Sequence, residues 1–253
     1  MRRILKSKGA MTGIETAIIL IAFVIVAASF AFVVLNMGFF TAQRSKTVIG
    51  SGLSEASSAI EIDGSVIAYG VPKDNYADIA SAGDMPLSAD QLYSILTSND
   101  EYEYGFAYKV VIYIKLSSGR QPVELTRGKL VITFSNPRVS IDNIYIPTSA
   151  LPSGSSLSET DLDNICTVDE VVGDSDELLE EGEKFKIVIN LAYLYEHFDD
   201  VATSMGISYM SSKEDIFVGP HETFTIEVKP PVGAILTIER MIPPAVDYVM
   251  NLS

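Results

Sequence analysis

Hydrophobic and polar positions divide the chain into two regions with different periodicities. Residues 16–43, TAIILIAFVIVAASFAFVVLNMGFFTAQ, contain no charged side chain and are mostly apolar on every helical face. At about 1.5 Å per helical residue this segment reaches roughly 42 Å, which exceeds the ~30 Å hydrocarbon core of a bilayer. A helix that is apolar all round is buried all round, so we expect lipid or other helices on each side of it.

The helical spacing of apolar residues continues beyond this segment. A stripe at the i, i+4, i+7 positions passes through Val48, Ile49, Leu53, Ala56 and Ile60. Gly50 and Gly52 lie inside this stretch, and each disfavours a helix by about 1 kcal/mol. Asp63-Gly64 offers a turn after it. The pattern therefore predicts a hydrophobic helix over residues 10–62 and a separate head over residues 63–253.

From residue 65 onward the apolar positions follow the period of a β-strand. Segments 185–191 and 223–228 alternate with this period, 108–116 is rich in β-branched and aromatic residues, and 129–134 and 233–239 are further predicted strands. Short strands at this density predict an antiparallel β-sandwich of immunoglobulin-like style, and with the helix an α+β fold class. A short helix is expected at Ser88–Thr97, capped by Ser88. The Ser/Gly-rich segment Leu151–Asp161 is expected to be an exposed loop.

Charge is distributed unevenly along the 253 residues. The formal net charge is −15, yet Arg2, Arg3, Lys6 and Lys8 all lie within the first nine residues, which contain no acidic residue. So acidic a remainder argues against nucleic-acid binding, which needs basic patches, and suits a solvated extracellular surface. Cys166 is the only cysteine, so no intrachain disulfide can form. It is expected to be a small buried hydrophobe, with a free thiol as the alternative.

The N-terminus differs from a conventional secretory signal. Such a signal has a short apolar region followed by a small-residue cleavage site. Here the apolar run is longer, and the small residues Gly9 and Ala10 precede it, next to Lys8. A cut at that position would remove the basic leader and keep the apolar helix in the mature protein.

The N-terminal sequence closely resembles that of archaellins, the archaeal flagellins. The resemblance is carried by KGAMTGIE, beginning at Lys8, and by the run TAIILIAFVIVAASFAFVVLNMGFFTAQRSK that follows. The resemblance is specific through about residue 50. In the rest of the chain it is limited to the general character of an acidic, β-rich domain. It implies a class III signal peptide over residues 1–9, removed by a prepilin-peptidase-like membrane protease. It further implies a precursor held in the cytoplasmic membrane, an archaellum motor and assembly complex, and an extracellular filament used for swimming.

The processing site is expected among Lys8, Gly9, Ala10 and Met11. In the family the cut usually follows a glycine, which favours the Gly9–Ala10 bond. Cutting after Ala10 instead would place Gly13 third and Glu15 fifth in the mature chain, which fits the family spacing better. The sequence does not decide between these two cleavage sites.

Six residues of the helix are the candidates for assembly contacts: Gly13, Glu15, Phe23, Ala27, Phe30 and Phe39. The aromatic side chains are expected to pack between helices rather than to form a cofactor pocket. Glu15 stands at the start of the helix, where the macrodipole favours a carboxylate. Its alternative role is to pair with the new α-amino group, of its own chain or of a neighbour, during assembly.

Candidate chemistry in the head is sparse. The densest acidic cluster is Asp174, Asp176, Glu177, Glu180, Glu181 and Glu183. Its spacing differs from an EF-hand loop, so a solvated turn is expected, with a divalent-cation site between subunits as the alternative. Asn251 begins the only N-x-S/T sequon. His197 and His221 have no Ser/Asp framework, and no phosphate-binding loop or C-x-x-C is present. We expect no catalytic residues, metal or cofactor.

These patterns favour a structural filament subunit that polymerises with copies of itself or with paralogues. Two alternatives share part of the plan. One is a type IV adhesion pilin, against which the LNMGFFTAQ run weighs. The other is a monomeric membrane-anchored surface protein with the helix as a permanent anchor, against which the lack of a catalytic constellation weighs.

Overall fold

A computed structural model describes residues 9–57, 60–80, 85–98, 102, 104–152, 157–209 and 212–252. The chain divides into two compact units, Met1–Leu53 and Ser54–Ser253. The first contains most of a single helix, and the second contains all the strands. Each unit is described by itself.

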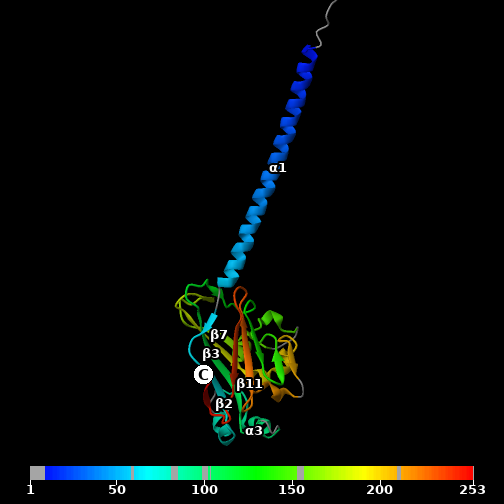
Figure 1. Cartoon of the computed structure of the whole chain (residues 1–253). Helices are drawn as coiled ribbons and strands as arrows, with labels where there is room; N and C mark the ends of the chain where they lie inside the picture. Colours follow the sequence, from blue (N-terminus) through cyan, green and yellow to red (C-terminus); the bar gives the residue numbers. More distant parts are fainter. Residues whose placement is uncertain are drawn as a thin grey trace, which may run out of the picture. The chain divides into compact units, whose positions relative to one another are not determined.

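Helix α1 runs without interruption over Gly9–Ser57 (Figure 1). It contains no proline, and Gly38, Gly50 and Gly52 do not break it, because each costs only about 1 kcal/mol against a long run of satisfied backbone bonds. The expectation of a helix to residue 62 is wrong at its C-terminal end. Ile60–Ile62 form strand β1 instead, which pairs antiparallel with β3. Ile60 is buried in the head core, and an apolar residue at helical spacing is equally suited to a strand.

The head contains two main antiparallel sheets, as the strand periodicity predicts. The first has the order β13 (Val249–Leu252), β2 (Val66–Val71), β3 (Phe106–Leu116), β9 (Lys184–Asn190), β7 (Cys166–Val172), with β1 also on β3. The second has the order β10 (Ile207–Tyr209), β6 (Val139–Ile141), β5 (Val131–Ser135), β11 (Thr223–Lys229), β12 (Leu236–Met241). A small third sheet joins β4 (Val123–Glu124) to β8 (Leu178–Leu179).

One continuous core lies among these strands. Buried and half-buried residues alternate along β5 and β11, as expected for strands with one inward face. Phe134 and Phe224 are buried on these neighbouring strands with ring centroids 6.1 Å apart. The central strand β3 is buried at eight of its eleven positions and pairs with β2 on one side and β9 on the other. This interior makes the head a self-contained body.

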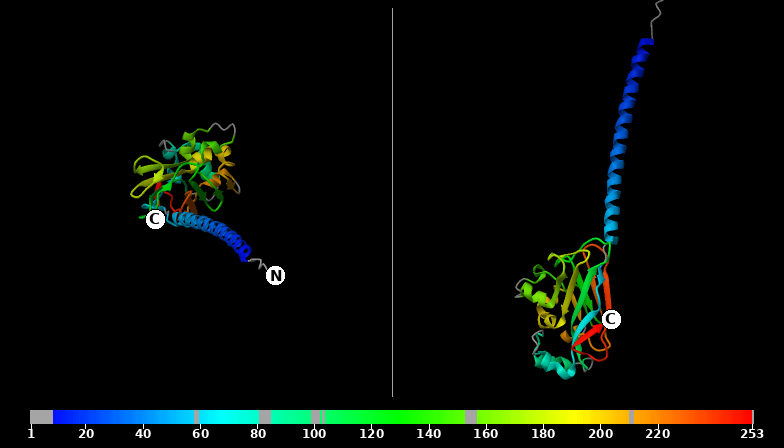
Figure 2. Two further views of the ribbon diagram at one scale, coloured as in Figure 1. Left: turned by 90° about the horizontal axis from the view of Figure 1, so that it is seen from above. Right: turned by 90° about the vertical axis from the view of Figure 1, so that its left-hand side faces the viewer.

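Short helices fill the connections of the head. They are α2 (Tyr76–Ala80), α3 (Ala89–Ser98), α4 (Glu159–Ile165), α5 (Leu191–Glu196), α6 (Phe198–Val201) and the 3-10 turns Lys73–Asn75, Thr148–Ala150 and Lys213–Ile216. Figure 2 shows α2 and α3, in teal, at one end of the head. Ser88 caps α3 as expected: the Gln91 backbone N–H donates to Ser88 Oγ at 3.3 Å. The loop expected at Leu151–Asp161 ends earlier than predicted, because Ser158 and Asp161 form a capping box that starts α4.

Gly70 lies at a close approach between two segments of the head. The register between β2 and β3 shifts at Tyr69/Gly70, and a Cβ on Gly70 would lie 2.4 Å from Val246 Cγ1 and 2.8 Å from the Asp247 carbonyl oxygen. The segment before β13 therefore packs directly on the glycine. Only a residue without a side chain fits there.

Candidate functional site

The outstanding surface of the molecule is α1. Every large apolar side chain between Ile14 and Ile49 is 52–73% exposed, and these side chains face all directions around the helix axis. The stretch Gly13–Gly50 is long and apolar enough to cross a membrane. A helix with this surface requires an apolar environment, because soluble monomers rarely expose apolar patches beyond a few hundred Å².

The residues expected to make assembly contacts all lie on this exposed helix. Phe23, Phe30 and Phe39 are 73%, 71% and 67% exposed, and Glu15 and Ala27 are also exposed. Ala27 lies on the same side of the helix as Phe23 and Phe30, whereas Phe39 lies on the opposite side of the axis from Phe30, nine residues on. A Cβ on Gly13 would have no atom within 4 Å.

Three hydroxyl groups on α1 donate hydrogen bonds to the backbone of the same helix. Ser29 and Thr41 donate to the carbonyl oxygens of Ile25 and Met37, four residues earlier, both at 2.8 Å. Thr47 does the same at 3.0 Å. These hydroxyls therefore add little polarity to the outer surface. Near the end of the uncharged segment, the Arg44 guanidinium lies over the Phe40 ring, 5.6 Å from its centroid.

The expected processing residues lie at the start of α1. Gly9, Ala10 and Met11 have helical backbone, whereas Lys8 falls outside the described residues. A peptide bond in a regular helix is held away from the extended form that proteases bind. The processing site stays a prediction.

The acidic cluster is not uniformly solvated. Glu183 is only 9% exposed and accepts a hydrogen bond from the Glu180 backbone N–H at 2.9 Å. Asp176 accepts from the Leu178 N–H at 2.7 Å, which closes the turn before β8. Among the described residues, no group of three His, Cys, Asp or Glu side chains is arranged to hold a metal ion. The described contacts are those of a hydrogen-bonded turn, and the cation alternative stays untested.

The remaining candidate residues of the head have local structural settings. Cys166 is fully buried at the start of β7, as a small hydrophobe, and burial raises the pKa of its thiol to about 12. Asn251 is exposed on β13, opposite Ile67 of β2. His197 joins α5 to α6, and His221 takes a positive φ of 63° in a turn. Glycosylation of Asn251 stays a prediction.

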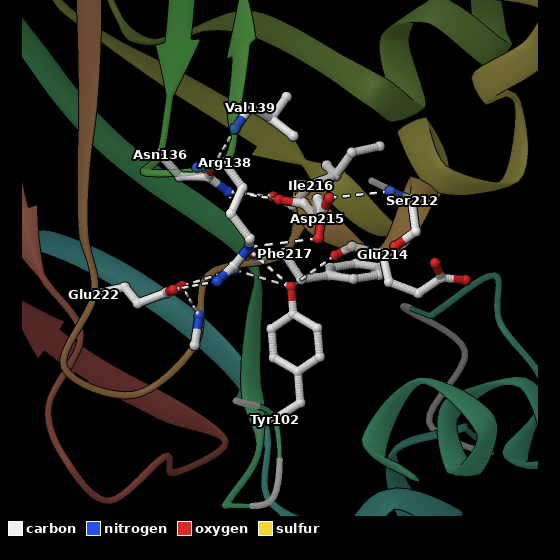
Figure 3. A network of polar contacts seen from close by, with 11 residues as sticks. Tyr102, Asn136, Arg138, Val139, Ser212, Glu214, Asp215, Ile216, Phe217 and Glu222 are labelled. Atoms are coloured by element: carbon white, nitrogen blue, oxygen red, sulfur yellow. Dashed lines mark hydrogen bonds and ion pairs between the residues drawn. The ribbon is translucent and has the colours of Figure 1, made fainter. Parts of the chain in front are cut away.

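The structure contains one buried ionic network that the sequence patterns do not indicate (Figure 3). The Arg138 guanidinium pairs with both carboxylate oxygens of Glu222, and it donates to the Tyr102 hydroxyl and the Phe217 carbonyl oxygen, both at 2.9 Å. Asp215 lies 3.6 Å from Arg138 Nε. All three charged side chains are less than a fifth exposed.

Asn136 completes this network from the turn between β5 and β6. Its amide nitrogen lies within hydrogen-bond distance of the carbonyl oxygens of Asp215, Ile216 and Phe217, and its carbonyl oxygen accepts from the Arg138 and Val139 N–H groups. The network ties three segments that are far apart in the sequence: Tyr102, the turn at residues 136–139, and residues 215–222. Its partners are protein groups, so it acts as a structural clamp.

Tyr195 and Glu214 lie beside the clamp. Burial, and then the hydrogen bond to Glu214, raise the pKa of Tyr195 to about 12. Burial pushes the pKa of Glu214 upward, but hydrogen bonds from Ser212, from its own backbone and from Tyr195 outweigh it and lower that pKa below its usual value. Both shifts move the pKa of the group further from neutral pH.

A fully exposed apolar helix followed by a self-contained β-sandwich defines a protein that acts through its helix, as an anchor or as a subunit packed among other helices. The sequence matches the archaeal-type flagellin family over residues 10–240. It is 34% identical over 249 residues to Probable flagellin 1 of Aeropyrum pernix, covering 94% of each chain. It is 31% identical over 251 residues to Probable flagellin 1 of Archaeoglobus fulgidus, covering 99% of this chain and 98% of that one.

The fold agrees with this relationship. The structure of the archaeal flagellum of Methanospirillum hungatei strain JF1 matches with a TM-score of 0.50 at 19% identity, covering 95% of this chain and 98% of that chain. The chain belongs to the archaeal-type flagellin family and is a structural subunit of the archaeal flagellum. The resemblance inferred from the N-terminal motif is confirmed, as is the prediction of a long apolar helix before antiparallel sheets.

Proposed function

We propose that α1 is the polymerisation element of the subunit and that the β-sandwich forms the outer wall of the filament. The observation that carries this proposal is the contrast in exposure. The large apolar side chains of α1 are more than half exposed on every side, whereas the head buries its own core. Packing α1 against copies of itself covers that surface at about 25 cal/mol per Å².

The helix is suited to two successive environments. Before assembly, a lipid bilayer covers the uncharged segment 16–43, since that segment exceeds the thickness of the hydrocarbon core. In the filament, neighbouring helices replace the lipid. Both surroundings are apolar, so the hydrophobic stabilisation persists when the helix leaves the membrane. An archaellum assembly complex would drive this transfer, and the motor would rotate the finished filament outside the cell.

Removal of α1 tests the polymerisation role. A fragment that starts at residue 58 keeps β1 and all later strands. We expect it to be soluble, to unfold cooperatively and to form no filaments by electron microscopy, while the full chain polymerises. Filaments built by the fragment alone would contradict the proposal.

We further propose that a prepilin-peptidase-like protease removes the basic leader before assembly. The small residues Gly9 and Ala10 at the N-terminal side of the apolar segment support this. N-terminal sequencing of filaments is expected to show a start at Ala10 or Met11. Gly9→Val is expected to leave the precursor uncut if the bond after Gly9 is the correct one. A mature start at Met1, or beyond residue 35, would contradict processing at this site.

A further inference from the structure

One line along α1 differs from all others. Starting at Glu15, every seventh residue is small or polar: Glu15, Ala22, Ser29, Asn36, Gln43 and Gly50. Each of the other six seven-residue series through residues 15–53 contains at least one large apolar side chain. A seven-residue step turns a 3.6-residue helix by only about 20°, so Ser29, Asn36 and Gln43 lie within about 40° of one another. We call the six residues the polar stripe.

Two side-chain amides on the polar stripe differ from the three hydroxyls of α1 that bond to their own helix. The hydroxyls of Ser29, Thr41 and Thr47 are satisfied by carbonyl oxygens of their own helix. In the part of α1 that the structure describes, the side-chain amides of Asn36 and Gln43 have no such partner, and both residues are exposed. A primary amide offers two N–H donors and an acceptor oxygen. Burying it without partners is unfavourable, so these two groups require hydrogen bonds wherever the helix is covered.

The position of Asn36 suits the membrane stage. It lies 21 residues after Glu15, which is about 31 Å along the axis and close to the ~30 Å hydrocarbon thickness. With Glu15 at one boundary of the bilayer, Asn36 reaches the other boundary, where headgroups and water solvate its amide. When helices replace lipid in the filament, that solvation is lost and the amide needs a protein partner.

Resting on the proposed polymerisation through α1, we propose that the polar stripes of neighbouring subunits face each other and that Asn36 and Gln43 fix the register between them. The occupant of this face is a second copy of the chain. Small residues on the stripe allow close approach of two helices, and amides are self-complementary because each both donates and accepts. Apolar contacts tolerate sliding, whereas an amide pair forms only at one axial offset, as a buried asparagine does in a coiled coil.

Cysteine cross-linking in assembled filaments tests the contact directly. Full-length Asn36→Cys and Gln43→Cys subunits, alone and mixed, are oxidised and the dimer yield is measured. A disulfide needs Cα atoms within about 7 Å, so only facing residues form one. Val34→Cys is the matched control, two residues away and about 200° around the axis. The native Cys166 is buried and adds no background.

We expect at least one of the Asn36→Cys, Gln43→Cys or mixed filaments to give several-fold more dimer than Val34→Cys. Yields no higher than the control in all three would overturn the proposal while leaving polymerisation intact. Absence of filaments from the unsubstituted chain would instead refute the proposed function. The two failures are therefore distinguishable.

Helical symmetry supplies the second readout. Asn36→Leu keeps an apolar side chain of similar size but removes the amide, and Asn36→Gln keeps the amide. We expect Asn36→Leu filaments to show an altered or heterogeneous rise and twist by electron microscopy, and Asn36→Gln to retain the original values. If Asn36→Leu changes only the amount of membrane-inserted precursor and leaves rise and twist unchanged, the amide serves the membrane boundary and the register role is wrong.

Discussion

Helix α1 and the head obtain stability from different sources. The head buries large side chains such as Phe106, Phe134 and Phe224 within one chain, and it pairs the buried Arg138 with carboxylates of the same chain in the clamp. Helix α1 satisfies its backbone by itself but leaves its apolar surface exposed. The comparison shows that one chain can contain a complete tertiary fold and an element whose surroundings must come from outside. Substitutions in α1 should therefore affect filament assembly, whereas substitutions in the head core should affect the stability of the head.

The largest expected effect is a charge in the middle of α1. Ala27 lies 12 residues after Glu15 and 17 before Arg44, so no charged side chain of the same helix reaches it. We expect Ala27→Asp to abolish filaments, because a carboxylate among packed helices loses hydration at several kcal/mol per subunit. The head should still fold, as circular dichroism would show. Ala27→Val is the matched control, and normal filaments from Ala27→Asp would refute a packed-helix core.

A substitution in the clamp should destabilise the head. Arg138→Leu leaves Glu222 and Asp215 as buried carboxylates without their cation, so we expect the free energy of unfolding of the head to fall by about 3–5 kcal/mol. Urea unfolding of the full chain in detergent, followed by a head-specific signal, measures this change. Lys229→Met breaks the more exposed pair with Glu227 and should change the same quantity by at most about 1 kcal/mol. Equal effects of the two substitutions would contradict the clamp.

Glycine substitutions compare the tightness of packing in the head with that around α1. A Cβ on Gly70 would overlap Val246 and the Asp247 carbonyl, whereas a Cβ on Gly38 in α1 has nothing within 4 Å. We expect Gly70→Ala to destabilise the head by about 1–3 kcal/mol through overpacking. Gly38→Ala should leave the head unfolding midpoint unchanged in the same detergent experiment. If the Gly70→Ala head is as stable as the original, the segment at Val246 and Asp247 can move away from residue 70 without cost, and the prediction is wrong.

The smallest expected effect concerns pH. Hydrogen bonding to Lys184, opposed by desolvation and aided by Lys115, lowers the pKa of Asp63 below its usual value. A lowered folded-state pKa contributes stability that is present above the unfolded value and lost as the pH falls through the folded value. We expect the urea midpoint of the head to fall slightly more between pH 5 and pH 2 in the original chain than in Asp63→Asn. An identical acid response in both chains would contradict this contribution.

Within α1 the same titration should have no counterpart between Thr16 and Gln43, where no side chain is charged. Packing along that stretch is therefore expected to be independent of pH over the range in which the head responds. Filament rise and twist measured at two pH values on either side of 4 would check this.

Local pattern alone determined much of this protein. The uncharged segment specifies a helix that needs external cover. Alternation, β-branched and aromatic content and turn residues together identify β3, β5, β9, β11 and β12 within a few residues of their bounds. Ser88 signals its own helix start. Such features depend on residues near in sequence, where side-chain spacing and backbone preference are set directly.

Tertiary structure decided the features that depend on distant residues. Ile60 fits the apolar spacing of the helix, but it lies in a strand. This strand hydrogen-bonds to β3, and the Ile60 side chain is buried in the core of the head. The clamp requires Tyr102, Arg138 and Glu222 to meet across the head, and Gly70 is required only because Val246 packs on it. The C-terminal strand β13 pairs with β2, near the opposite end of the head sequence. These long-range contacts cannot be predicted from the spacing of residues along the chain. They form because distant segments bury one common core, and local conformational preference does not specify them.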